Sequence, residues 1–251
     1  MDVHLISATE QWAQFAIAGP DSRRLLEQIV DAPFDISNDA FPFMACSELT
    51  VCSGTPARLF RISFSGELAY ELAVPARYGH ALIERLMAVG EPLGVTPYGT
   101  EALGVMRIEK GHAAGNELNG QTTAGNLGLG RMVSTKKDCV GGVLSKRADM
   151  NDDNANDLVG FMPEDSSVTL KAGAHFIARG NTVNLDNDEG WMTSVAYSPT
   201  VKSSIGLGFI RNGLKRQGEV VMACDPVRGE QHDVRIVSAH FVDPEGERLR
   251  G

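Results

Sequence analysis

The stretch RADMNDDNAND, residues 147–157, divides the chain into two halves with different residue patterns. It is dense in Asp and Asn and has little apolar content, which is typical of an exposed linker. With 251 residues, the chain is long enough to bury one or two cores. We therefore predict one domain over residues 1–146, a linker over 147–157 and a second domain over 158–251.

The first half alternates predicted strands and helices. WAQFAIAGP has the pattern of a short apolar strand that ends at Gly19 and Pro20, and Asp21 or Ser22 can cap the helix that follows. This order favours an α+β layer in which helices pack on an antiparallel sheet. The other expected elements are strands near 48–53, 57–64 and 67–74, and helices over about 76–89 and 100–111.

The second half consists of short β-like runs separated by turn residues, without a long helix. Many short strands of this kind are typical of a small barrel or sandwich. We therefore expect an all-β domain after the linker. Its candidate strands are FIARGNTVNL, WMTSVAYSP, SIGLGFI, GEVVMACD and HDVRIVSAHFV.

The charge of the chain argues against nucleic acid as its main partner. The formal net charge is −9, whereas binding to phosphates requires clusters of basic residues. No run of about 18 apolar residues is present, so we expect no membrane span. The N-terminus lacks a basic leader followed by an apolar core, so we expect no secretory signal and a cytoplasmic protein.

The cysteines and histidines do not form metal-binding patterns. Cys46, Cys52, Cys139 and Cys224 contain no C-x-x-C pair, and the six histidines form no H-x-x-x-H or H-E-x-x-H grouping. We therefore expect no metal site, and we expect reduced, mostly buried thiols.

The run RISFSGELAYELAVP, residues 61–75, leaves two interpretations of Glu71 open. With a three-residue loop over residues 65–67, Arg61 faces Glu71 across a hairpin and the two form a surface ion pair. With a two-residue loop, Glu71 faces Phe60 and lies on the apolar side, where a carboxylate must find hydrogen-bond donors. Residue propensity alone favours the first register, whereas the second is the arrangement expected at a ligand site.

Arg107 lies in the predicted helix GTEALGVMRIEKG, next to Met106 and Leu103 rather than on a clean polar face. It does not face Glu109, because residues two positions apart on a helix point in different directions. We interpret Arg107 either as an internal strut or as a side chain that reaches across to another element.

Several of these segments resemble one known family in their order and spacing. FRISFSGELAYELAVP, TPYGTEALGVMRIEKG, TTAGNLGLGRMVSTKKD and SPTVKSSIGLGFI follow one another as in the aminomethyltransferase (glycine-cleavage T-protein) family. The strongest likeness is to the C-terminal, folate-binding part of the alpha subunits of heterotetrameric sarcosine oxidases, which the segment FPFMA also resembles. The resemblance covers almost the whole chain.

The resemblance implies a ferredoxin-like α+β fold, an antiparallel sheet with helices, followed by a small C-terminal β-barrel. It implies that the chain binds tetrahydrofolate and, in the full complex, accepts a one-carbon unit to form methylenetetrahydrofolate. The family's pterin-binding pair corresponds to Phe64 and Glu71, whose carboxylate can accept two parallel N–H bonds. Tyr70 and Arg131 are carried over as further folate-binding residues.

Three departures from the family pattern affect these expectations. Phe64 replaces a Tyr and loses its hydroxyl. Arg131 replaces a Trp, so it either stacks through its guanidinium or leaves the pocket changed. The family's catalytic Asp lies in a segment before the stretch that matches HLISATEQWA, with which this chain begins. The resemblance therefore leaves the catalytic residue unassigned and implies that the chain is inactive alone.

The resemblance also sets the expected partners and cofactors. Flavin and NAD are expected only on other parts of the complex. The expected partners are folate and either the other sarcosine oxidase subunits or the preceding N-terminal part.

Two non-catalytic interpretations remain open. The segment KDCVGG, which contains Cys139, lies where folate-binding proteins that help to mature iron–sulfur proteins carry K-G-C-Y-x-G-Q. The Gly, Tyr and Gln of that motif are missing here. The other interpretation is a module that docks onto further oxidase subunits and has a degenerate pocket.

Overall fold

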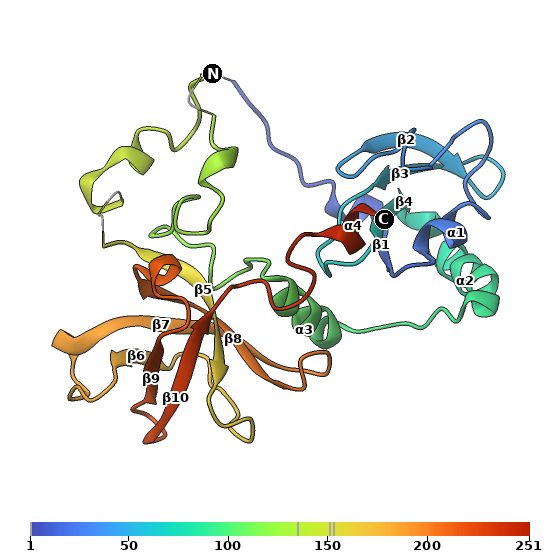
Figure 1. Cartoon of the computed structure of the whole chain (residues 1–251). Helices are drawn as coiled ribbons and strands as arrows, with labels where there is room; N and C mark the ends of the chain where they lie inside the picture. The colour runs from blue at the N-terminus through green and yellow to red at the C-terminus, as the bar shows by residue number, and fades with distance from the viewer. Residues whose placement is uncertain (1, 135, 151, 153) are drawn as a thin grey trace. The chain divides into compact units, whose positions relative to one another are not determined.

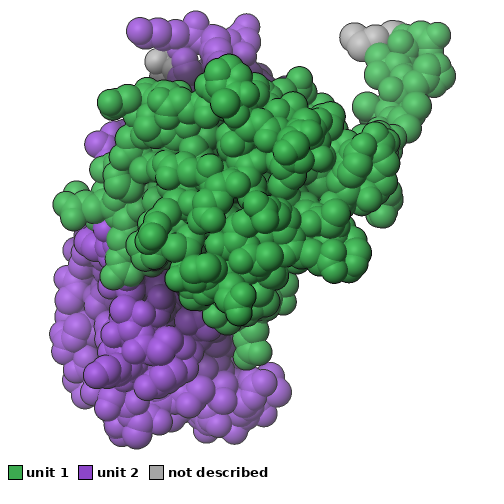
Figure 2. All heavy atoms as spheres, turned by 90° about the vertical axis from the view of Figure 1, so that its right-hand side faces the viewer, with its two compact units in different colours: residues 1–103, 245–251 green, residues 104–244 purple. Residues whose placement is uncertain are grey.

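The computed structural model describes residues 2–134, 136–150, 152 and 154–251. These residues form two compact units, which Figure 2 shows in green and purple. Unit 1 comprises Met1–Leu103 and Glu245–Gly251, and unit 2 comprises Gly104–Pro244. Each unit has its own hydrophobic core.

Unit 1 is built on a four-stranded antiparallel sheet with the strand order β1-β4-β3-β2 (Figure 1). β1 pairs with β4, β4 with β3 and β3 with β2. The connection from β1 to β2 contains a short helix, and two longer helices follow β4. The elements are β1 (Trp12–Ala18), α1 (Ser22–Leu26), β2 (Cys46–Val51), β3 (Thr55–Phe60), β4 (Ala69–Pro75) and α2 (Gly79–Gly90). The next helix, α3 (Thr100–Lys110), begins at the end of unit 1 and lies mostly in unit 2.

The alternation of side chains along β4 gives the sheet two different faces. Tyr70, Leu72 and Val74 point to one face and form the core of unit 1 with apolar side chains of α1 and α2. The intervening residues point to the other face, which we call the Glu71 face. It carries Trp12, Gln14, Arg58, Phe60, Glu71 and Ala73.

The connection between β3 and β4 settles the register that the sequence left open. β3 ends at Phe60 and β4 begins at Ala69, so a loop replaces the predicted tight hairpin. Phe60 pairs with Glu71, as in the second of the two predicted registers, but Glu71 points away from the unit 1 core rather than to the apolar side. The predicted ion pair between Arg61 and Glu71 is therefore wrong.

Arg61 is buried inside unit 1 instead, with only 1% of its surface exposed. Its Nη1 donates a hydrogen bond to the carbonyl of Phe41 at 2.7 Å, and its Nη2 donates to the carbonyl of Arg250 in α4 (Glu247–Arg250). Burial lowers the pKa of the Arg61 guanidinium. These carbonyl partners explain why Arg61 does not turn outward toward Glu71.

Unit 2 contains a closed antiparallel barrel with the strand order β10-β5-β8-β7-β6-β9. Phe161 and Phe176 stack in its core with their ring centroids 3.9 Å apart. The predicted fold class, a sheet with helices followed by a C-terminal barrel, is confirmed. The strands are β5 (Asn156–Pro163), β6 (His175–Ala178), β7 (Asp188–Ser198), β8 (Ser203–Arg211), β9 (Val220–Asp225) and β10 (Glu230–Val237).

The paired strands β7 and β8 approach each other closely at Gly190, and this close approach requires a glycine. Gly190 has a φ of +150°, and a Cβ at this position would meet the carbonyl oxygen of Phe209 at 2.0 Å. Any larger residue would separate the two strands, because neither backbone can move without breaking their ladder.

The division into units lies earlier in the chain than the predicted domain boundary at residue 146. Ile108, near the end of α3, packs against Leu158, Ile205 and other apolar residues of the barrel, so the segment from Gly104 onward joins unit 2. β5 begins at Asn156, inside the stretch predicted as a linker. Residues 151 and 153 of that stretch lie outside the described residues.

The expectation that most thiols are buried is wrong. All four cysteines are free, and Cys46, Cys52 and Cys139 are exposed, whereas Cys224 is buried. Cys46 and Cys52 lie at the two ends of the edge strand β2, where little of the sheet covers them. Among the described residues, no helix is both long and apolar enough to cross a membrane.

Candidate functional site

Glu71 is an acidic residue near one end of the Glu71 face, which also carries Glu48 on β2. Its cross-strand neighbours are Phe60 on β3 and Ala16 on β1. Gln14 lies diagonally from it on β1, and the Gln14 Nε2 donates a hydrogen bond to the Glu71 Oε2. The carboxylate is only partly buried, and its Oε1 has no hydrogen-bond partner in the described part of the chain.

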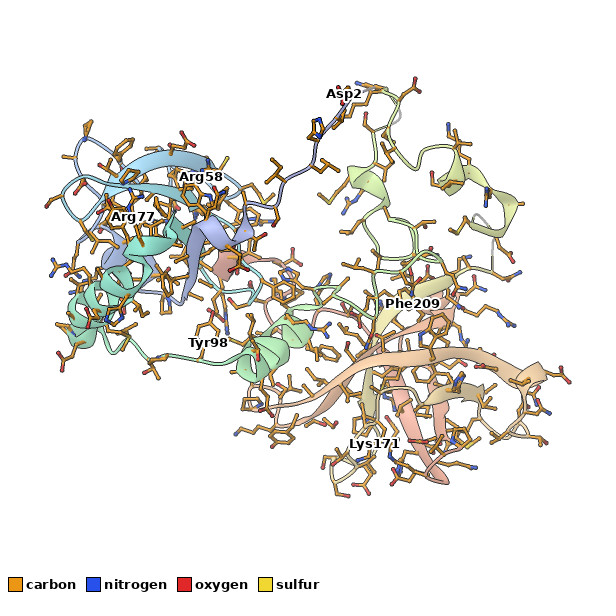
Figure 3. The ribbon with its side chains drawn as sticks, turned by 180° about the vertical axis from the view of Figure 1, so that it is seen from behind. Asp2, Arg58, Arg77, Tyr98, Lys171 and Phe209 are labelled. Atoms are coloured by element: carbon orange, nitrogen blue, oxygen red, sulfur yellow. The ribbon has the colours of Figure 1, made fainter. Side chains whose placement is uncertain are left out.

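Unit 1 contains a cavity of about 620 Å³, and Glu71 is not among the residues that line it. Gln14, the hydrogen-bond partner of Glu71, contributes to its wall, and so does Tyr98, which precedes α3 and is labelled in Figure 3. The remaining wall comes from β1, from apolar residues of α2 and from the segment 93–103. The cavity wall therefore presents an amide and a phenol, and the amide of Gln14 connects it to the Glu71 carboxylate.

The charge of Glu71 affects the pKa of the Tyr98 phenol. Burial raises the pKa of Tyr98, and the negative charge of Glu71 raises it further, because both disfavour the phenolate. Glu71→Gln is therefore expected to lower the pKa of Tyr98, although burial keeps it above its ordinary value of about 10. An ultraviolet titration of the tyrosinate band measures this, with Tyr98→Phe identifying the signal. An unchanged titration curve would contradict the proximity of the two groups.

Arg58 is the cationic residue of the Glu71 face (Figure 3). Its guanidinium carbon lies 4.1 Å from the centroid of the Trp12 ring, and its Nε lies 3.3 Å from Oε1 of Glu48. Ala73 is only 3% exposed, although it points to the same face. We attribute this burial to the Arg58 side chain, which passes over Ala73 to reach Trp12.

The other predicted site residues occupy different environments. Phe64 lies in the loop between β3 and β4 and is 41% exposed. Tyr70 is fully buried on the opposite face of the sheet from Glu71, where its hydroxyl accepts a hydrogen bond from Arg23. Arg131 is exposed in unit 2, in the 3-10 turn Gly130–Met132. The structure brings Glu71 together with Gln14 rather than with Tyr70, and folate contacts of Phe64 and Arg131 stay predictions.

Sequence reasoning missed two members of the site. Gln14 is the polar residue of the run WAQFAIA, and its two-residue alternation from Trp12 could have indicated that both point to one face. Tyr98 had no such signal, because it lies in the connection that precedes α3.

Unit 2 contains a fully buried carboxylate that sequence reasoning missed. Glu117 is fully buried and accepts hydrogen bonds from the Ala114 amide at 2.9 Å and the Ser194 hydroxyl at 2.6 Å. Its other partners are the Thr193 hydroxyl and Arg107, whose Nη1 lies 3.2 Å from the carboxylate. Arg107 also donates to Ser194 at 2.7 Å. All donors are internal, so this network holds β7 to the segment after α3 and has a structural role.

Two family models match the chain. The GCVT N-terminal domain matches residues 1–137, and the glycine cleavage T-protein C-terminal barrel domain matches residues 156–243. The first covers more than half of the chain, and the second coincides with the barrel strands. The chain therefore belongs to the glycine-cleavage T-protein family, as its sequence motifs predicted.

Within this family, the chain is similar to parts of larger oxidising enzymes. It is 47% identical to the sarcosine oxidase subunit alpha of Rhizobium meliloti, over 99% of this chain and 25% of that protein. It is 28% identical to the mitochondrial dimethylglycine dehydrogenase of Mus musculus, over 99% of this chain and 28% of that protein. The chain thus spans about a quarter of the length of these two relatives.

A solved structure shares the fold. The crystal structure of the glycine cleavage system aminomethyltransferase T from Bartonella henselae matches with a TM-score of 0.71 and 21% identity. The match covers 93% of this chain and 60% of that one. At this identity the likeness concerns the fold alone.

Proposed function

We propose that unit 1 binds tetrahydrofolate through Glu71, and that the chain is the folate-binding, one-carbon-accepting part of a sarcosine-oxidase-type enzyme. The observation that carries this proposal is the Glu71 carboxylate itself. It lies on a sheet face rather than in an ion pair, and its Oε1 has no hydrogen-bond partner among the described residues. Its neighbour Gln14 holds Oε2.

The chemistry of this carboxylate fits the aminopyrimidine edge of a pterin. That edge presents two adjacent N–H donors, and a carboxylate offers two oxygens in the matching geometry. The hydrogen bond from Gln14 does not prevent this, because each carboxylate oxygen can accept more than one donor. Gln14 instead fixes the direction in which the carboxylate points.

Aromatic side chains near Glu71 suit the flat rings of the same ligand. Phe60 is the direct cross-strand neighbour of Glu71, and Tyr98 lines the cavity to which Gln14 contributes. Flat aromatic surfaces stack favourably on each other. Phe64, in the loop between β3 and β4, is proposed from the family resemblance as a further stacking residue.

The role of this chain is then to bind and orient the one-carbon acceptor. We propose that the one-carbon unit comes from an amine oxidised elsewhere in a larger enzyme, whose other subunits would be the partners of this chain. When bound, tetrahydrofolate supplies the nitrogen nucleophiles that take up this unit. Glu71 and Gln14 hold the pterin end, and no catalytic residue is assigned in this chain.

Calorimetric titration of the 251-residue chain with tetrahydrofolate tests the proposal. Glu71→Gln removes the charge and one acceptor and keeps the size of the side chain. It is expected to weaken binding about tenfold to a hundredfold, because hydrogen bonds to charged groups contribute about 1.5–3 kcal/mol.

Glu84→Gln is the matched control for this titration. Glu84 is an exposed carboxylate of α2, and its replacement should leave the affinity unchanged. Absence of binding heat in the unmodified chain, or equal affinity for the Glu71→Gln variant, would overturn the proposal.

A further inference from the structure

The Arg58 guanidinium is held in one orientation on the Glu71 face. Arg58 pairs with Ala73, and Trp12 pairs with Pro75, so β4 lies between the arginine and the indole. The side chain crosses this strand above Ala73, whose methyl group leaves room for it. Stacking on Trp12 and the contact with Glu48 then fix the plane of the guanidinium.

This arrangement leaves the outer edge of the guanidinium available. Glu48 contacts Nε, whereas Nη1 and Nη2 have no hydrogen-bond partner in the described part of the chain. The side chain of Arg58 is 45% exposed. A planar guanidinium with two free nitrogens matches the two oxygens of a carboxylate. An arginine that is already stacked also loses less conformational entropy when it binds.

The position of Arg58 relative to Glu71 matches the two ends of an elongated ligand. Glu71 lies opposite Ala16 on β1, and Trp12 lies four residues further along the same strand. At about 3.3 Å per residue, the two positions are about 13 Å apart along the strand. Gln14 lies between them on the same face. A ligand with a donor-rich heterocycle at one end and a carboxylate at the other would satisfy both charged groups.

We propose that Arg58, held by Trp12, binds a carboxylate of the glutamyl tail of folate. This proposal rests on the proposed function, in which Glu71 binds the pterin at the other end. A benzoyl group and its linkers separate the two ends of folate, and this part of the ligand would lie along β1 past Gln14. The Glu71 face would then select pterins that carry the acidic tail over pterins that lack it.

Two ligands separate the tail from the pterin in a calorimetric test. Tetrahydrofolate carries both, whereas 6-methyltetrahydropterin has the reduced pterin alone. Arg58→Gln is expected to weaken the binding of tetrahydrofolate about tenfold, as for the loss of a half-exposed charged hydrogen bond. The affinity for 6-methyltetrahydropterin should stay the same, which also shows that the variant is folded.

Further variants test how Arg58 is held. Trp12→Ala removes the stacking partner and should reproduce the selective loss for tetrahydrofolate, whereas Trp12→Phe should largely retain binding. Arg24→Gln is the matched control, because Arg24 is an exposed arginine of α1 in the same unit, on the side of the sheet that the helices cover. It should affect neither ligand.

The outcomes distinguish this proposal from the proposed function. If Glu71→Gln weakens both ligands and Arg58→Gln weakens neither, or weakens both equally, the tail-binding role of Arg58 is wrong and the pterin site stands. If the unmodified chain binds neither ligand, both proposals are wrong. A loss confined to tetrahydrofolate in Arg58→Gln supports the tail-binding role.

Discussion

Replacement of Glu117 by alanine is expected to lower the free energy of unfolding of unit 2 by about 3–5 kcal/mol. The carboxylate is fully buried and pairs with Arg107, so its removal leaves that guanidinium, only 14% exposed, without its counter-charge. The hydroxyls of Thr193 and Ser194 lose an acceptor at the same time. Removing one partner of a buried pair costs more than the pair contributes, because the other partner stays buried.

The two tryptophans of the chain allow the two units to be followed separately. Trp12 belongs to unit 1 and Trp191 to unit 2, so urea unfolding of a Trp12→Phe background reports on unit 2 by fluorescence. Glu117→Gln is the milder substitution for comparison, because it keeps the shape of the side chain and some of its hydrogen bonds. It should lower the free energy of unfolding less than Glu117→Ala does. A loss below about 1 kcal/mol for Glu117→Ala would show that water replaces the carboxylate.

Phe161→Ala is expected to destabilise the barrel by about 3–5 kcal/mol. The ring is fully buried and stacks on Phe176 in the middle of the unit 2 core. Its removal deletes a large apolar surface and leaves a cavity that the closed barrel cannot fill by collapse. The same Trp191 fluorescence in urea measures the change.

Phe161→Leu is the control for this substitution. It retains much of the buried volume and is expected to cost clearly less than alanine. Unit 1 unfolding, followed through Trp12 in a Trp191→Phe background, should change little in either variant. Equal losses for the leucine and alanine variants would contradict a cavity as the cause.

Periodicity in the sequence was sufficient to predict most strands and both long helices. The runs WMTSVAYSP and SIGLGFI became β7 and β8. In β8, the alternating Ile205, Leu207 and Phe209 pack with Ile108 in a cluster apart from the barrel core, and Gly206 lies against Met192 of that core.

β5 was not predicted, and its first residues, Asn156 and Asp157, continue the Asp- and Asn-rich stretch that was predicted as a linker. The side chains of these two residues are polar, as in a linker. They form part of a strand because they pair with Arg211 and Ile210 of β8.

The candidate site was harder to predict than the fold, because its contacts are distant in sequence. Propensity alone paired Arg61 with Glu71, and it could not foresee the carbonyl groups of Phe41 and Arg250 that keep Arg61 in the core. Likewise, Glu117 resembles any surface glutamate in sequence, because its partner Thr193 is 76 residues away. The family motifs identified Glu71, whereas Gln14 and Arg58 required the sheet register, and Tyr98 required the path of the connection before α3.

The return of the chain to unit 1 has a consequence for its synthesis. Residues 245–251 belong to unit 1 together with the first 103 residues, and Arg61 donates a hydrogen bond to Arg250. A ribosome must therefore produce all of unit 2 before unit 1 can be completed, a delay on the order of ten seconds at usual elongation rates. During this delay unit 1 lacks its closing segment, and the buried Arg61 guanidinium lacks the Arg250 carbonyl as a hydrogen-bond acceptor.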